Sequence, residues 1–513
     1  SENLIYLLIK LIGLAARDAR LTMNLYYLLT FPLAALAALF VLRRLGVSYP
    51  PAFVAAVLFA LLPYHFLRSE CHLTLSSYFL VPFAILVAVW LYFGRLPRRR
   101  TLAAVVICLL LSAGGVYYAF FSCALLATAA LAAAARLRAW RPVAAGGLLV
   151  GLILGGTLAN LAPTLLYQRA HGTNAFVAHS QRAGAEIYGL KVTQLVMPIT
   201  RHRLRPLAKV KEKYNSVAPL VNENDMASLG AVAAVGFVVL LARALLRRRP
   251  APRMTDALAL LNLAAVLVGT VGGVGSLFSY ALLPPIRSYN RLSVYIAFFA
   301  LALVARGMDR LAARRAGSPW KRRAAYGLLG LLLALGLLDQ TSPAYTPNHA
   351  ALRATHAEDA AFVAAVEARL PAGACVMQLP YVPFPETPAV HGMQDYDHLR
   401  AYLHSHSLRW SYGAVKGREA DDWQRRTAAQ PAADLVNTLV GAGFRGIYVN
   451  RAGFADEGEA LVKDLRTAGL AEPLPSRSGR LLFYDLADYA FASRRACPGG
   501  PHGGDEPRRS PAR

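Results

Sequence analysis

Residues 102–135 read LAAVVICLLLSAGGVYYAFFSCALLATAALAAAA. This segment contains no charged side chain, which is typical of a membrane-embedded chain rather than of a soluble core. As one helix it would be roughly 50 Å long, whereas the hydrocarbon core of a bilayer is only about 30 Å thick. Gly114 and Gly115 stand at its centre, where residues without a side chain permit the backbone to break. The segment therefore predicts two short membrane helices that meet at these glycines.

Similar apolar segments lie on both sides of this one along the chain. We expect further spans at residues 21–42, 52–66, 73–93, 143–167, 227–246, 255–283, 292–304 and 324–338. With the two helices of 102–135, the sequence predicts an all-α polytopic membrane domain of about ten transmembrane helices. Hydropathy falls after Thr341, so we expect a small soluble α/β domain to follow.

The composition agrees with a membrane protein. The chain has 513 residues, of which 56% are hydrophobic and only 16% are charged, whereas soluble proteins average about 25% charged. Its 55 Lys and Arg against 29 Asp and Glu give a net charge of +26, a balance also seen in nucleic-acid binders. Here the basic residues separate apolar segments, so we exclude a nucleic-acid partner and a soluble enzyme. The five cysteines form no C-x-x-C pair, and the sequence offers no evident cofactor motif and no support for a divalent metal.

The connections between spans set the orientation. Five of them are rich in Lys and Arg, namely residues 43–44, 95–100, 136–141, 243–253 and 306–323. Counting the spans alternately places all five on one side, which the positive-inside rule makes cytoplasmic. We therefore expect a multi-pass protein of the bacterial inner (plasma) membrane, with the long loop 168–225 and the C-terminal domain outside the cytoplasm.

The pattern divides the chain into four parts. Residues 1–20 are expected to form an amphipathic helix on the outer surface or to be a remnant of the first outer loop, with the tail of an earlier span as the alternative. The membrane domain covers 21–342 and the soluble α/β domain 343–490, and the Pro-, Gly- and Arg-rich tail 491–513 should be disordered. Because the chain opens inside an apolar stretch without the basic start of a signal peptide, we expect its natural N-terminus to be missing.

The soluble part alternates helix and strand patterns. Its expected helices are 357–370, 432–442 and 456–468, and its expected strands are 375–379, 446–450 and 481–485.

Polar residues at the outer ends of spans are functional candidates, because charge is costly at membrane depth. They occur in the turn 64–72, in the long loop and in the turn 284–291, where two arginines break the positive-inside tendency. We predict that these residues bind a lipid phosphate: Arg68, His72, Lys191, Arg201, His202, Arg287, Asn290 and Arg291. The alternatives are an interfacial belt for the first turn and a solvated loop near anionic lipid for the long loop.

Aromatic residues provide candidate sugar-binding surfaces. Tyr117 and Tyr118 follow the central glycines, and Trp410, Tyr412 and Trp423 stand close together in the sequence of the C-terminal domain. Flat apolar rings with a polar edge suit the C–H face of a sugar, so we predict that these five bind sugar or acceptor. The alternative is that they only pack.

Four segments carry a family resemblance: PYHFLRSECH at 63–72, GVYYAF at 115–120, EIYGLK at 186–191 and RSYNRL at 287–292. Their order resembles the polyprenyl-phosphate-sugar-dependent glycosyltransferases of the C superfamily (GT-C), and among them the bacterial members often labelled sugar translocases. The resemblance covers most of the chain. It implies an inverting transfer in which a polyprenyl phosphate leaves and a carboxylate on the first outer loop acts as base. That loop would lie upstream of Ser1.

We therefore predict a membrane glycosyltransferase, a hexosyl- or pentosyltransferase, that uses a polyprenyl-phosphate donor. Its acceptor would be an envelope glycan, lipid or protein on the extracytoplasmic face. Within the sequence, the candidate catalytic carboxylates are Glu186, Glu223 and Asp225. Two alternatives stay open, a lipid-linked sugar transporter or flippase and a non-catalytic membrane assembly factor. Transporters tend to show inverted repeats with paired broken helices, and we find one glycine-split pair without a partner.

Overall fold

The computed structural model describes residues 2–94, 96–176, 183–246, 253–281, 286–314, 319–487 and 489. The chain folds as two compact units. The first comprises Ser1–Gly172 and Ser180–Thr346, and the second comprises Thr173–His179 and Pro347–Arg513. The second unit thus takes in a short piece of the long loop, which the sequence analysis did not anticipate. The predicted tail 491–513 lies outside the described residues.

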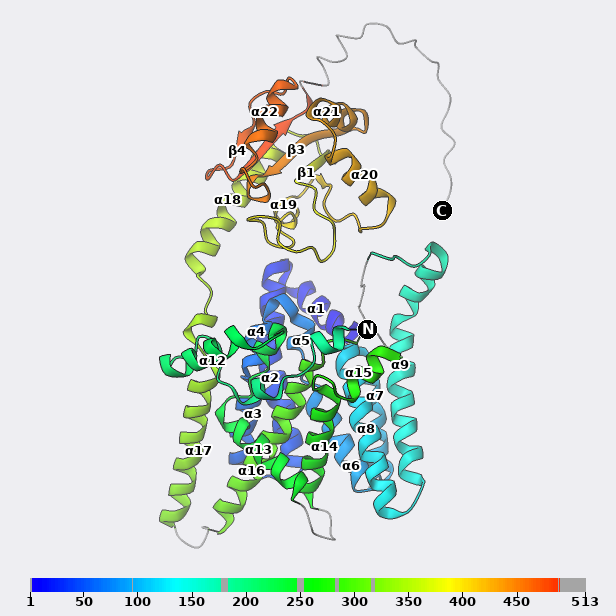
Figure 1. Ribbon diagram of the computed structural model, residues 1–513, viewed down its shortest axis with the longest axis vertical. Coiled ribbons are helices and arrows are strands. Elements are labelled where there is room, and N and C mark those ends of the chain that lie inside the picture. The colour runs from blue at the N-terminus through cyan, green and yellow to red at the C-terminus, as the bar shows by residue number, and fades with distance from the viewer. Residues whose placement is uncertain are drawn as a thin grey trace. The chain divides into compact units, whose positions relative to one another are not determined.

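The first unit is a polytopic membrane domain, so the chain is an integral membrane protein. In the described part, seven helical segments are long and apolar enough to cross a membrane: Ala19–Arg44, Tyr49–Arg68, Glu70–Tyr92, Val116–Leu137, Arg141–His171, Tyr289–Arg314 and Trp320–Gln340. Shorter apolar helices accompany them at Asn3–Ala16, Ala231–Leu245 and Met254–Gly269. The bundle is drawn in Figure 1. A total of about ten spans stays a prediction.

The helices of this unit follow in chain order. The first half contains α1 (Asn3–Ala16), α2 (Ala19–Arg44), α3 (Tyr49–Ala60), α4 (Pro63–Arg68), η1 (Glu70–His72), α5 (Leu73–Ser76), α6 (Val81–Tyr92), α7 (Arg98–Ala113), α8 (Val116–Leu137) and α9 (Arg141–His171). The second half contains α10 (Gly184–Ile187), α11 (Val192–Val196), α12 (Arg205–Val217), η2 (Asn222–Ala227), α13 (Ala231–Leu245), α14 (Met254–Gly269), α15 (Val274–Ala281), η3 (Tyr289–Leu292), α16 (Ser293–Arg314), α17 (Pro319–Gln340) and η4 (Pro343–Tyr345).

Glycine pairs interrupt two apolar segments. The predicted break between α7 and α8 is confirmed, since Gly115 has a φ of 124° and a Cβ on Gly114 would stand 2.6 Å from a methyl carbon of Leu80. The prediction of one span over 255–283 is wrong, because α14 ends at Gly269 and α15 starts afresh at Val274. Between them Gly272 adopts a φ of 70°, which an L side chain rarely takes.

The part of the long loop that the structure describes is largely helical. It contains α10, α11, α12 and η2, and its backbone joins the bundle where the Leu229 N–H donates to the Leu195 carbonyl at 3.0 Å. Such pairing satisfies backbone groups close to the membrane, where unpaired ones are costly.

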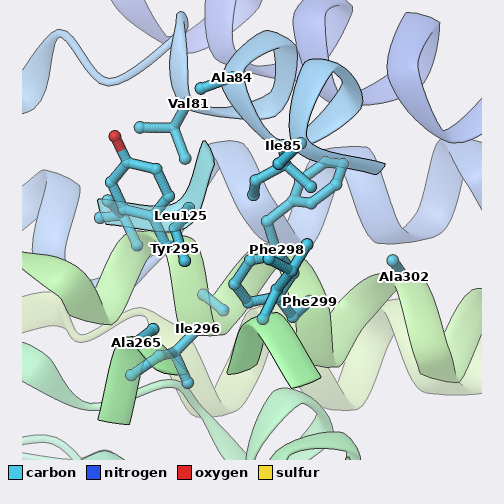
Figure 2. Close-up of a cluster of buried hydrophobic side chains, with 14 of the residues drawn as sticks. Val81, Ala84, Ile85, Leu125, Ala265, Tyr295, Ile296, Phe298, Phe299 and Ala302 are labelled. Carbon is cyan, nitrogen blue, oxygen red and sulfur yellow. The ribbon is translucent and has the colours of Figure 1, made fainter. Parts of the chain in front are cut away.

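The core of the bundle forms where α6, α8, α14 and α16 meet. Figure 2 shows Val81 and Ile85 of α6 facing Tyr295 and Phe298 of α16. Every residue of α16 from Ser293 to Ala302 is buried. In lipid such packing is held by close van der Waals contact and interhelical hydrogen bonds rather than by the hydrophobic effect. The Ser122 and Tyr295 hydroxyls, 2.9 Å apart, supply one such bond between α8 and α16.

The second unit is built on a five-stranded sheet of order β2-β1-β3-β5-β4. The strands are β1 (Cys375–Leu379), β2 (Arg409–Trp410), β3 (Phe444–Asn450), β4 (Leu474–Pro475) and β5 (Leu481–Asp485). The helices are α18 (His349–Glu367), α19 (Leu399–His404), α20 (Glu419–Ala428), α21 (Ala432–Gly441), α22 (Glu459–Thr467) and the short η5 (Arg451–Gly453). Strands β2, β1 and β3 run parallel, whereas β5 is antiparallel to β3 and to β4.

Residues alternate between the two faces of this sheet, as a strand period of two requires. Met377 and Ile447 belong to one apolar cluster, and their neighbours Val376 and Tyr448 belong to another. The three predicted strands are confirmed. Strands β2 and β4 were not predicted, because two residues are too short to show a period. Helix α20 was not predicted either, because its surface is mostly charged.

Candidate functional site

Three charged side chains from distant parts of the membrane unit meet in one cluster. Arg68 at the end of α4 donates through Nη2 to a carboxylate oxygen of Glu223 in η2, at 2.6 Å. Nη2 of Arg291 in η3 lies 3.8 Å from the same oxygen. The Arg68 side chain is 1% exposed and that of Arg291 is 11% exposed. We call Arg68, Glu223 and Arg291 the arginine cluster.

Local structure presents each member of the cluster. Pro63 starts the short helix α4, and Ser69, with a φ of 46°, ends it directly after Arg68. Glu223 and Arg291 lie in the short 3₁₀-helices η2 and η3, just before α13 and α16. All three residues therefore stand at the ends of membrane-domain helices, where the backbone changes direction.

Tyrosine rings line the cluster. The Arg291 guanidinium lies over the Tyr117 ring, 3.8 Å from its centroid, and the Arg68 guanidinium lies 5.2 Å from that of Tyr64. The Tyr118 hydroxyl donates to the Leu75 carbonyl at 2.5 Å and lies 3.4 Å from the Tyr64 hydroxyl. These tyrosines therefore hold the arginines in place by cation–π attraction and packing. One face of the Tyr117 ring is covered by Arg291.

The cluster has more hydrogen-bonding capacity than the protein uses. Nε and Nη1 of Arg68 and Nε of Arg291 are buried, and none of these three atoms has a hydrogen-bond partner among the described residues. Leaving a buried polar group unpaired costs about 1–3 kcal/mol. All three atoms are N–H donors, so the missing partner that best matches them is an acceptor, and above all an anion.

The charges of the cluster support the same conclusion. Two arginines face one carboxylate, which leaves an excess of one positive charge. Burial by itself would raise the pKa of Glu223, but the hydrogen bond and charge of Arg68, together with the charge of Arg291, outweigh it and lower that pKa. Glu223 is therefore ionised at neutral pH and is a weak base. The charges of all three residues also interact electrostatically with the His72 side chain.

Asp225 lies two residues further on and is held by different partners. Its carboxylate accepts from the Thr200 hydroxyl at 2.6 Å and from the Asn215 amide at 2.8 Å, and lies 3.2 Å from Nζ of Lys211. Burial would raise the pKa of Asp225, but these hydrogen bonds and the Lys211 charge lower it. All of these partners belong to the long loop, and two of them lie on α12, so Asp225 links α12 to η2.

Glu186 and Arg287 lie on neighbouring segments that pack together. The Arg287 guanidinium lies 5.3 Å from the Tyr188 ring centroid, and the Asn290 N–H donates to the Tyr188 carbonyl at 3.3 Å. Glu186 accepts from the Gly272 N–H at 2.9 Å and forms no ion pair with another described residue. Among the three candidate carboxylates Glu186, Glu223 and Asp225, it is the one without a cationic partner in the described part.

The remaining predicted phosphate ligands do not join the cluster. Lys191 donates to the Pro219 carbonyl, and His202 lies with Nε2 3.3 Å from Asp339. Arg201 is exposed, and its carbonyl accepts from Ser342. The structure therefore brings Arg68, Asn290 and Arg291 together with His72 nearby. It places Arg287 beside Tyr188, and Lys191, Arg201 and His202 along the attachment of the loop.

The aromatic residues of the second unit do not form a single patch. The Trp410 ring meets Tyr448 at a centroid distance of 5.6 Å, whereas Trp423 stacks on Phe444, also at 5.6 Å, within the other apolar cluster. The two indoles therefore lie against opposite faces of the sheet. Tyr412 packs against Phe384 at 5.5 Å. Each of the three rings is half-buried, so a role in binding sugar or acceptor stays a prediction for them singly and not as one surface.

Two residues near the cluster were missed by the sequence analysis. Tyr64 was quoted only as part of a motif, yet its ring lies beneath Arg68. The Glu2 side chain lies 3.9 Å from where a Cβ on Gly115 would stand, on the same turn as Tyr117 and Tyr118. A lone acid before an apolar helix carries no linear signal for this placement. No group of three or more His, Cys, Asp or Glu in the described part could hold a metal ion.

A family model described as a domain of unknown function, DUF6311, matches residues 4–341. The chain belongs to this family. All three members of the arginine cluster fall inside the DUF6311 region, which ends with the last candidate span. No curated protein matches the chain in sequence.

Several solved structures are similar to this DUF6311 chain at low identity. The arabinofuranosyltransferase AftD from Mycobacteria is 17% identical with a TM-score of 0.47, over 93% of this chain and 36% of that one. The oligosaccharyltransferase of Archaeoglobus fulgidus in its apo form is 13% identical with a TM-score of 0.42, over 91% and 64%. ArnT from Cupriavidus metallidurans bound to undecaprenyl phosphate is 13% identical with a TM-score of 0.45, over 94% and 85%. The chain thus spans about a third of AftD and less than two thirds of the oligosaccharyltransferase.

Proposed function

We propose that this protein is a membrane glycosyltransferase that takes its sugar from a polyprenyl-phosphate donor. The observation that carries the proposal is the arginine cluster, whose buried, unpartnered donors stand at the ends of membrane-domain helices. Arginine N–H groups suit phosphate oxygens in geometry and charge, and fixed positive charge stabilises a departing phosphate. Because the cluster stands at the ends of the membrane-domain helices, the polyprenyl chain would remain in the bilayer while its phosphate reaches Arg68 and Arg291.

The acceptor hydroxyl needs a positioned base. Glu223 and Asp225 are ion-paired, with pKa values below the ordinary range, so they are poor proton acceptors. Glu186 is half-buried on the segment that packs against the turn carrying Asn290. We therefore assign it the role of base within the described residues. The proposed acceptor is an envelope glycan, lipid or protein. The bacterial members labelled sugar translocases, which the sequence resembles, belong to the same group of polyprenyl-phosphate-sugar-dependent enzymes.

Arg291→Gln should weaken binding of polyprenyl phosphate to the purified protein by about 10- to 100-fold, because charge-assisted hydrogen bonds contribute about 1.5–3 kcal/mol. Arg287→Gln is the matched control on the same turn, since Arg287 contacts Tyr188 and not the cluster. Binding can be measured by native mass spectrometry or by titration in detergent. Equal affinities for wild type and Arg291→Gln would remove the cluster from the donor site.

Glu186→Gln separates transfer from transport in the same preparation. We expect it to bind polyprenyl phosphate like the wild type and to lose transfer of the sugar. A wild-type protein that binds the lipid and moves it between leaflets with the sugar still attached would instead be a flippase. Binding without either reaction would indicate the assembly factor.

The proposal places the cluster on the extracytoplasmic side, which cysteine labelling can test. In a background without native cysteines, a cysteine at Glu212 on the exposed side of α12 should react with an impermeant maleimide in intact spheroplasts. One at Arg138, between α8 and α9, should react only after permeabilisation, because its connection is among the basic ones. The reverse labelling pattern would place the cluster on the cytoplasmic side and contradict the proposal.

A further inference from the structure

Helix α12 has three distinct sides. Its inward side repeats every three to four residues and consists of Leu207, Ala208, Lys211, Tyr214 and Asn215, all buried or half-buried. Its outward side carries an apolar stripe, in which Val210 is 50% exposed and Val217 is 76% exposed. The flanking Leu204 and Leu220 are also exposed. Large apolar side chains that point away from the protein need an apolar partner.

Positive charge accompanies this apolar stripe. From 201 to 217 the exposed charged residues are five cations and one acid, namely Arg201, Arg203, Arg205, Lys209, Lys213 and Glu212. The remaining cation, Lys211, points inward and lies 3.2 Å from Asp225. The outward surface of α12 is therefore both apolar and strongly basic.

The start of α12 is attached to the end of the last candidate span. The Arg203 guanidinium donates to the carbonyl and the hydroxyl of Thr341, at 3.0 and 3.1 Å. His202 lies 3.3 Å from Asp339, and the span itself ends at Gln340. Figure 1 shows α12 lying across this end of α17. Helix α12 therefore lies at the level of the boundary between membrane and water.

We propose that α12 is an interfacial helix that docks on anionic phospholipid headgroups. Val210 and Val217 enter the boundary of the acyl chains, while Lys209 and Lys213 contact the headgroup phosphates. Helices with an apolar side and a basic side bind membranes in this way, and each Lys or Arg near an anionic surface contributes about 1 kcal/mol. The proposal does not rest on the glycosyltransferase assignment.

The docked helix would also position the arginine cluster. Asn215 and Lys211 on its inward side hold Asp225, which lies two residues from Glu223 in η2. Two side chains thus connect the helix that would dock on lipid to the segment that faces Arg68.

Fluorescence quenching in the full-length protein tests the docking. Single cysteines at Val210, Val217 or Glu212, in a background without native cysteines, carry an environment-sensitive label in vesicles that contain phosphatidylglycerol. Labels at 210 and 217 should be quenched by brominated acyl chains and shielded several-fold from aqueous iodide. The label at 212 should remain open to iodide. Equal access of iodide at all three positions would overturn the proposal.

Lipid charge and protein charge provide the second arm. In vesicles of phosphatidylcholine alone, and in the Lys209→Gln/Lys213→Gln variant with phosphatidylglycerol, shielding at 210 should decrease. Arg445→Gln, which removes an exposed cation of the second unit, should leave the shielding unchanged. Shielding that is indifferent to both changes would assign the surface to a protein partner or a second copy and overturn the lipid proposal.

Discussion

Arg68→Met should destabilise the membrane domain by about 3–5 kcal/mol, which is the usual cost of removing one partner of a buried ion pair. The Glu223 carboxylate would lose its 2.6 Å hydrogen bond, and the more distant Arg291 at 3.8 Å would be the cation that remains near it among the described residues. The expected observation is a clearly lower apparent melting temperature of the detergent-solubilised protein. A variant that melts like the wild type would show that the pair is open to solvent.

The double variant Arg68→Met/Glu223→Met separates stability from binding. Part of the lost stability should return, since well-packed apolar residues can replace a buried pair at little cost, although Arg291 then loses its carboxylate partner. Binding of polyprenyl phosphate should nevertheless stay lost, because Arg68 supplies two of the three unpartnered arginine donors. If binding returned together with stability, Arg68 would have only a structural role.

The stability of the second unit should fall as the pH drops from 6.5 to 4, by about 3 kcal/mol in total. His398 is 2% exposed, and burial lowers its pKa to about 4 although its hydrogen bond to the Pro380 carbonyl opposes the shift. The unfolded chain takes up a proton near pH 6.5, so between these values it binds more protons than the folded chain. Urea titrations of the full-length protein, followed by proteolysis of residues 347–487, measure this dependence.

His398→Gln is the control for this pH dependence. This substitution should remove the change in the stability of the second unit between pH 6.5 and 4.5. The loss of stability at lower pH should remain. That later loss involves Glu367, where burial is outweighed by hydrogen bonds from Ser407, His406 and Ser405, so that its pKa falls to about 2. An unchanged slope in His398→Gln would show that another group takes up the proton.

Local features of the sequence were sufficient for the membrane domain and for much of the sheet. Apolar length predicts a span because the bilayer has a set thickness, and Gly114 and Gly115 break a helix by their own backbone freedom. The alternation over 446–450 likewise needs no distant residue to indicate a strand. The predicted span over 255–283 contained the same signal, Gly272 and Gly273, and was wrong because its continuous hydropathy was followed instead of the glycine pair.

The arginine cluster depended on tertiary structure. Arg68 and Glu223 are separated by 155 positions, and no local pattern states that η2 will fold back against α4 rather than toward Glu186. Trp410 and Trp423, although close in sequence, were separated by the sheet between them. Hydropathy and backbone preference act over a few residues, so the sequence by itself determined which segments enter the membrane. Which charged ends then meet depends on how all the helices pack, because a buried charge is stable only where that packing supplies its partner.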